Sequence, residues 1–150
     1  MPDHVKISFA KLPARLEGLV VVLAAEPVEG DAPAFAPSVE ALLAPASAQL
    51  ASAMQAERFT GKSGKGIDLL APAGLDASRL LVMGVGKPAD LKAFDWLKLG
   101  GAIMGRLPAA AKDVSVVLAL PGGEVPGDAA AELALGLRLR AYAFDRYKTK

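Results

Sequence analysis

The sequence of 150 residues contains no cysteine. This absence excludes disulfides, thiolate zinc sites and cysteine nucleophiles, and it fits a reducing compartment. His4 is the only histidine, so a histidine-based metal cluster or catalytic triad lacks support. The sequence also has no large excess of positive or of negative residues, with 17 lysines and arginines against 16 aspartates and glutamates. The formal net charge of +1 provides no general electrostatic attraction for nucleic acid or for a membrane surface.

Long apolar runs and a secretion signal are missing as well. The longest run, Leu19 to Ala25, is far too short to span a bilayer, and the polar start, Met1 to Lys6, lacks the pattern of a signal peptide. We therefore expect a cytoplasmic protein with no membrane partner. Apolar residues nevertheless make up 53% of the chain and charged residues 22%. At this length, that balance predicts one globular domain with a substantial core.

Short β-branched and leucine-rich runs provide the strand candidates. Leu19 to Ala24 is continuously apolar, which predicts a central strand covered on both faces. Val5 to Phe9 alternates apolar and polar residues, which is typical of an edge or half-buried strand. Three further runs, each bounded by Gly, Pro or Asp, are predicted strands: Ile67 to Ala71, Arg79 to Val85 and Val114 to Leu120.

Three stretches predict helices. They are Ser47 to Glu57, Asp95 to Leu107, and Ala129 to Phe144 with Asp128 as N-cap. The second carries three glycines (Gly100, Gly101 and Gly105), whose cost of about 1 kcal/mol each relative to alanine indicates close packing of this helix against the sheet. Glu26 to Pro37 is expected to be a surface loop. The alternation predicts an α/β fold: a mixed, mostly parallel sheet flanked by helices on both faces.

The last predicted helix has two apolar stripes. Its sheet-facing stripe is Ala130, Leu133, Leu137, Ala141 and Phe144. A second stripe on the opposite side comprises Leu135, Leu139 and Tyr142. The outer face of such a helix is usually polar, so this pattern favours coverage by a further domain or another subunit. The alternative is that leucine is simply common here, since single exposed leucines need no explanation.

Two glycine motifs imitate nucleotide-binding sites. Gly61-Lys62-Ser63 resembles the end of a P-loop, but a helix precedes it and a strand follows, which is the reverse of the required order. Gly84 to Ala89 resembles a dinucleotide fingerprint, but Pro88 interrupts it and no acidic residue ends a strand at the required distance. The first is predicted to be a structural turn, and nucleotide binding is not expected at the second.

Three segments resemble the leucyl (cytosol) aminopeptidase family. Phe59 to Gly64 matches its Phe-x-Gly-Lys-x-Gly turn, and Val82 to Lys87 matches its Val-x-Gly-x-Gly-Lys strand end. Gly136 to Lys148 matches the Gly-Leu-x-Leu-x-x-Tyr-x-Phe-Asp-x-Tyr-Lys run that closes its N-terminal domain. Ala143 is a departure, because the family often has a basic residue there. Residues 1–58 match only in general pattern.

The resemblance implies that residues 1–150 are the N-terminal domain, macro-domain-like in fold, with 128–150 as its last helix and the start of a linker. Its partners would be the absent catalytic domain and the other subunits of a hexamer. The parent would release N-terminal residues from peptides with two divalent ions, zinc or manganese. The family's metal signature, Asn-Thr-Asp-Ala-Glu-Gly-Arg, is absent from this sequence. We therefore expect no catalytic, cofactor-binding or metal-binding residue in this chain.

Two alternatives remain open. A free-standing macro-domain-like module would bind ADP-ribose or another nucleotide through the loops at Gly84–Gly86 and Gly122–Gly123. Nucleic-acid binding through Lys62, Lys65 and Lys87 has only local charge in its favour and is not expected.

Overall fold

The computed structural model of this chain describes residues 6–10, 17–27, 30, 33–87, 95–107, 113–121, 123–124 and 127–148. Five strands form one sheet in the order β1-β5-β2-β4-β3. Their bounds are β1 Lys6–Ala10, β2 Glu17–Ala24, β3 Gly66–Leu70, β4 Asp76–Gly84 and β5 Asp113–Val117. All neighbours are parallel except β3, which runs antiparallel to β4. The predicted mixed, mostly parallel sheet is confirmed.

The run Leu19 to Ala24, predicted to be a central strand, forms β2 in the middle of the sheet, between β5 and β4. In β2, Val21 and Leu23 belong to the core on one face of the sheet, whereas Val20 and Val22 belong to the core on the other. All four side chains are at most 1% exposed. Coverage of both faces explains why this run carries no polar side chain.

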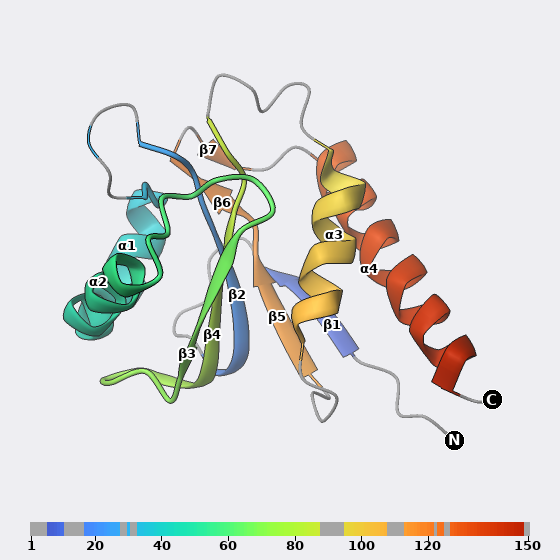
Figure 1. Ribbon diagram of the computed structural model, residues 1–150, viewed down its shortest axis with the longest axis horizontal. Helices are drawn as coiled ribbons and strands as arrows, with labels where there is room; N and C mark the ends of the chain where they lie inside the picture. Colours follow the sequence, from blue (N-terminus) through green and yellow to red (C-terminus); the bar gives the residue numbers. More distant parts are fainter. Residues whose placement is uncertain are drawn as a thin grey trace.

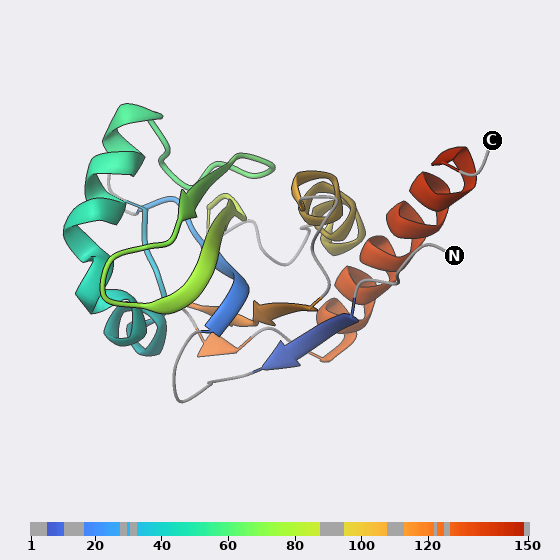
Figure 2. The same cartoon turned by 90° about the horizontal axis from the view of Figure 1, so that it is seen from below.

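Helices cover both faces, as predicted (Figures 1 and 2). One face carries α1 Pro37–Leu43, the short 3-10 helix η1 Ala44–Ala46 and α2 Ser47–Ala56, and the other carries α3 Trp96–Arg106 and α4 Gly127–Lys148. Helix α1 was not expected. Pro37 ends the predicted loop, but in the structure it opens α1, because proline suits the first helical position.

The predicted strand Val114 to Leu120 is wrong in its extent. It divides into β5, which ends at Val117, and β6 Ala119–Leu120, which pairs antiparallel with β7 Gly123–Glu124 in a separate small sheet. Leu118, at the division, is only 8% exposed. The apolar pattern therefore continues through the break and gives no sign of it.

The glycines of α3 do not pack against the sheet as predicted. A methyl group at Gly100 would overlap the backbone carbonyl of Leu133 in α4, and one at Gly136 of α4 would overlap the carbonyl of Leu97. The close approach is therefore between the two helices. Gly101 has no such neighbour within 4 Å, and Gly105 is exposed.

Helix α4 extends past both ends of the predicted Ala129–Phe144. Asp128 lies inside its first turn rather than before it, and its carboxylate accepts a hydrogen bond from the Ala129 amide at 3.0 Å. The predicted inner stripe is confirmed at Leu133 and Leu137, which are 0% and 1% exposed. The side chains of Ala141 and Phe144, also assigned to that stripe, lie outside the described part.

Of the helices that the structure describes, none combines the length and apolar character needed to cross a membrane.

Candidate functional site

The glycine-rich turn between α2 and β3 lies against the ends of two inner strands. The Gly84 amide donates to the Lys65 carbonyl at 2.8 Å, and the Gly86 amide donates to the Gly61 carbonyl at 2.9 Å. The Glu26 amide, just after β2, donates to the Gly86 carbonyl at 2.9 Å. Backbone hydrogen bonds thus join three segments: the end of β2, the turn and the end of β4.

Two glycines make this close approach possible. Gly61 has φ +93°, and a methyl group there would lie 2.6 Å from the carbonyl oxygen of Ala25. A methyl group at Gly84 would overlap the carbonyl oxygen of Lys62. The turn and the strand end therefore approach more closely than side chains would permit, and both motifs bring backbones together.

The same hydrogen bonds bear on the nucleotide hypothesis. A glycine loop holds phosphate through free amide groups that point at the ligand. Here the amides of Gly84 and Gly86 already donate within the protein. These two amides are therefore not available to bind the phosphates of ADP-ribose, which weakens the ADP-ribose alternative. Its other loop begins at Gly122, which lies outside the described residues.

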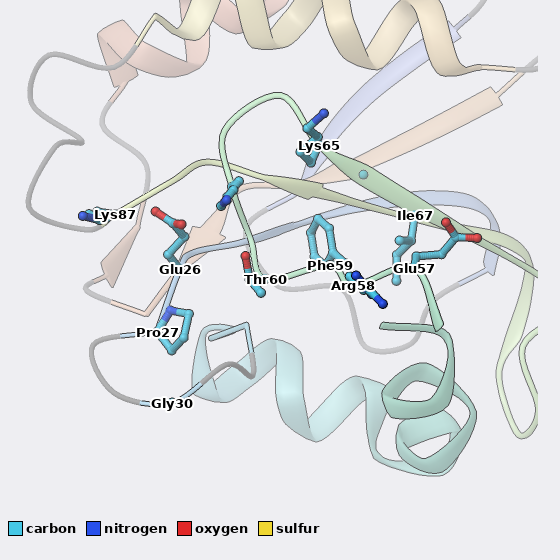
Figure 3. Close-up of a pocket in the computed structure, with 12 residues that line it drawn as sticks. Glu26, Pro27, Gly30, Glu57, Arg58, Phe59, Thr60, Lys65, Ile67 and Lys87 are labelled. Atoms are coloured by element: carbon cyan, nitrogen blue, oxygen red, sulfur yellow. The ribbon is translucent and has the colours of Figure 1, made fainter. Parts of the chain in front are cut away.

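A cavity of about 650 Å³ opens beside this junction (Figure 3). Its walls come from the segment after β2, the segment between α2 and β3 with the first residues of β3, and Lys87 beyond the end of β4. The chain leaves β2 toward α1 on one face of the sheet and leaves β4 toward α3 on the other (Figure 1). In open α/β sheets, ligands are bound beyond the carboxyl ends of strands at such a divergence.

The cavity is lined by more positive than negative side chains. Its cations are Arg58, Lys62, Lys65 and Lys87, and its acids are Glu26 and Glu57. Lys62, Lys65 and Lys87 are the three lysines named above in the nucleic-acid alternative. In the structure all three line one cavity. Arg58, Glu26 and Glu57 could not be assigned to this cavity from the sequence, because their position there depends on how the turn docks.

These cations have no ionic partner in the described part of the chain, where the ion pair found within 4.0 Å joins Arg79 to Asp68 at 3.1 Å. That pair lies on β3 and β4, and neither of its residues lines the cavity. A second cavity, of about 380 Å³, is lined mainly by Pro33, Ala51, Met54 and Gln55 and shares the segment 58–60 with the first.

The predicted lack of a metal site remains a prediction. Among the described residues, no three histidine, aspartate or glutamate side chains are grouped closely enough to hold a metal ion. Asp68 pairs with Arg79, and Asp95 accepts a hydrogen bond from the Lys98 amide at 3.0 Å, where it caps α3. His4 lies outside the described residues. The described side chains therefore do not fit a two-metal centre.

The outer stripe of α4 is exposed where its side chains are described. Leu135 is 49% exposed and Leu139 is 52% exposed, and Leu97 on the adjoining α3 is 39% exposed. Tyr142, the third residue of the predicted stripe, has a side chain outside the described part. The helix pair α3–α4 thus carries three of the four large apolar side chains that are exposed in the described structure, the fourth being Leu70.

Comparison with known proteins gives concordant matches. The family model described as “Cytosol aminopeptidase family, N-terminal domain” matches residues 20–150. “Probable cytosol aminopeptidase” of Xanthobacter autotrophicus is 49% identical over the whole chain, and that of Rhodopseudomonas palustris is 46% identical. The chain spans 29% of the length of each of these relatives.

A solved structure shows the same fold. A tomato leucine aminopeptidase variant superposes with a TM-score of 0.66 at 21% identity, over 93% of this chain and 29% of its own. The fold resembles one region of that longer protein. Together with the sequence matches across the whole chain, the matched residues 20–150 place this chain in the cytosol aminopeptidase family, where it corresponds to the N-terminal domain.

Proposed function

We propose that this chain is the non-catalytic N-terminal domain of a cytosolic leucyl aminopeptidase that releases N-terminal amino acids from peptides. One observation carries the proposal: relatives named as aminopeptidases match this chain over its whole length, while the chain covers only 29% of theirs. The parent enzyme would be cytoplasmic and hexameric, and its chemistry would reside in the remaining length.

We place the two divalent ions, zinc or manganese, in that remaining length too. In support, the family's metal signature is absent from the 150 residues, and the described carboxylates are engaged or dispersed. A two-metal site requires several carboxylates that converge on ions about 4 Å apart. No catalytic step is therefore assigned to a residue of this chain.

The domain's own role would be assembly of the parent or shaping of access to its active site. The exposed leucines Leu135 and Leu139 support this role, because they lie on the same helix as the fully buried Leu133 and Leu137. The domain uses one stripe of α4 for its own core and leaves the other available. We propose that the catalytic domain or a neighbouring subunit covers this outer stripe.

Hydrolysis of leucine p-nitroanilide tests the division of labour. We expect the purified chain with added manganese to show no turnover above a mock purification from the same host, whereas the full-length parent is active. The mock purification controls for host aminopeptidases. Turnover that copurifies with this chain and survives their removal would contradict the proposal.

A further inference from the structure

The cavity beside the glycine turn has the location and size of a small-molecule site. Its volume of about 650 Å³ lies within the range of about 300–1,000 Å³ found for ligand pockets. It lies beyond the carboxyl ends of β2 and β4, where the chain departs to opposite faces of the sheet. The assembly role proposed above rests on Leu135 and Leu139 of α4, which do not line this cavity.

The docked turn determines which groups remain for a ligand. Because the amides of Gly84 and Gly86 donate to the Lys65 and Gly61 carbonyls, those amides cannot hold a ligand. Recognition would therefore rely on the side chains of the lining. Arg58, Lys62 and Lys65 come from the segment between α2 and β3, and Lys87 lies three residues beyond the end of β4. Figure 3 shows Arg58, Lys65 and Lys87 on different parts of the wall.

The charge of this lining favours anions. Four cations stand against two carboxylates, Glu26 and Glu57, which gives the lining a net charge of +2 in a chain whose total is +1. All four cationic side chains are exposed, and within the described structure none forms an ion pair. A cleft lined by charge of one sign raises the local concentration of oppositely charged ligands.

We propose that this cavity binds a small multivalent anion bearing phosphate or carboxylate groups. Several cations in the lining of one cavity favour a ligand with more than one negative group, because the attractions of the separate charges add. Arg58 offers a planar fork of donors to an oxyanion, whereas the lysines act as point charges. The hydroxyl of Thr60, also in the lining, adds a donor that carries no charge.

Titration with pyrophosphate and with citrate, followed by amide chemical shifts of the folded chain, tests the proposal. At an ionic strength of about 0.01 M the Debye length is about 30 Å, so weak charge contacts are retained. We expect saturable shifts in residues 58–65 and in Lys87, with a Kd on the order of 1 mM for at least one probe. Binding of pyrophosphate alone would indicate a phosphate ligand, and binding of citrate alone would indicate a carboxylate ligand. Binding of both would indicate a site that selects for negative charge and not for the chemical group.

The decisive comparison uses two double variants that each remove two positive charges. Lys62→Gln with Lys65→Gln alters the cavity and should raise the Kd about tenfold, while the turn keeps its backbone hydrogen bonds. Lys98→Gln with Arg138→Gln alters exposed side chains of α3 and α4 outside the lining and should raise the Kd by a clearly smaller factor, because the attraction between charges falls with distance. Equal weakening in both, or no saturable binding of either anion, would overturn the proposal.

Discussion

Single glycines determine how the strand ends of this domain meet. Gly61 and Gly84 allow the turn before β3 to lie directly on the ends of β2 and β4. There the carbonyls of the turn accept hydrogen bonds from the amides of Gly84 and Gly86. Motifs that imitate phosphate-binding loops thus have their amide groups satisfied within the protein. A glycine motif is informative about function only when the partners of its amides are known.

Gly84→Ala should destabilise the domain, because the added methyl group meets the backbone of Lys62 and Gly61 and no side-chain rotation can relieve the overlap. We expect the free energy of unfolding to fall by about 2 kcal/mol, as measured by urea denaturation. Gly127→Ala is the matched control: it has no neighbour within 4 Å and should change this energy by less than about 0.5 kcal/mol. Equal stability of the two variants would contradict the close approach.

At the scale of elements, the contact between α3 and α4 organises one of the two cores. Trp96, Leu99 and Ile103 of α3 share a buried cluster with Leu133 and Leu137 of α4 and with the inner strands. Gly100 and Gly136 bring the two helix backbones together at their crossing. A side chain at either glycine would push the helices apart and open this cluster.

Gly136→Ala and Gly101→Ala should therefore have opposite effects, although both replace a glycine within a helix. Alanine at Gly136 meets the Leu97 carbonyl, and we expect a loss of about 1–3 kcal/mol in unfolding free energy. Alanine at Gly101 meets nothing within 4 Å and should raise the unfolding free energy by up to about 1 kcal/mol through helix propensity. Thermal denaturation of both proteins measures the difference. A stabilised Gly136→Ala would show that the helices are not in close contact.

The elements also show what local sequence can and cannot predict. The continuous apolar run of β2 predicted a central strand, because coverage of both faces leaves a direct mark on composition. The short helix α1 escaped prediction, because a proline that opens a helix looks like loop punctuation. The break at Leu118 left no mark, since both sides of it are buried.

The sequence patterns could not predict which elements pack against each other. The glycines of α3 indicated close packing, but a helical period cannot say whether a sheet or another helix lies opposite, and the partner of Gly100 proved to be α4. The sequence indicated local positive charge at the lysines of the cavity. These lysines line the same cavity as Arg58 and Glu26 because the turn docks on the strand ends, and this docking cannot be predicted from local sequence.

For the whole molecule, the outer stripe of α4 should matter for assembly of the parent and little for folding of this domain. Leu139 is 52% exposed, so Leu139→Asp should change the unfolding free energy of the chain by less than about 0.5 kcal/mol. In the parent it should weaken assembly, since burial of a leucine is worth about 1.5–3 kcal/mol. Sedimentation of the full-length variant measures the loss of oligomer.

Leu70→Asp provides the matched control, because Leu70 is 67% exposed but lies on β3, far in sequence from α4. We expect its oligomer to sediment as the unchanged protein does. If Leu139→Asp instead unfolds the isolated chain, the stripe belongs to the core of the domain. In that case the proposed interface would have to be abandoned.

The pairing of β1 with β5 joins Lys6 to Asp113, and it has a consequence for biosynthesis. Strand β1 leaves the ribosome well before β5, and it can take its place in the sheet only after β5 has followed it. The neighbours β2 and β4 can pair earlier, because Glu17 meets Asp76. Contacts distant in sequence form slowly, and an unpaired strand edge is prone to aggregation in the meantime. On the nascent chain, β1 therefore waits as an open segment and completes the sheet last.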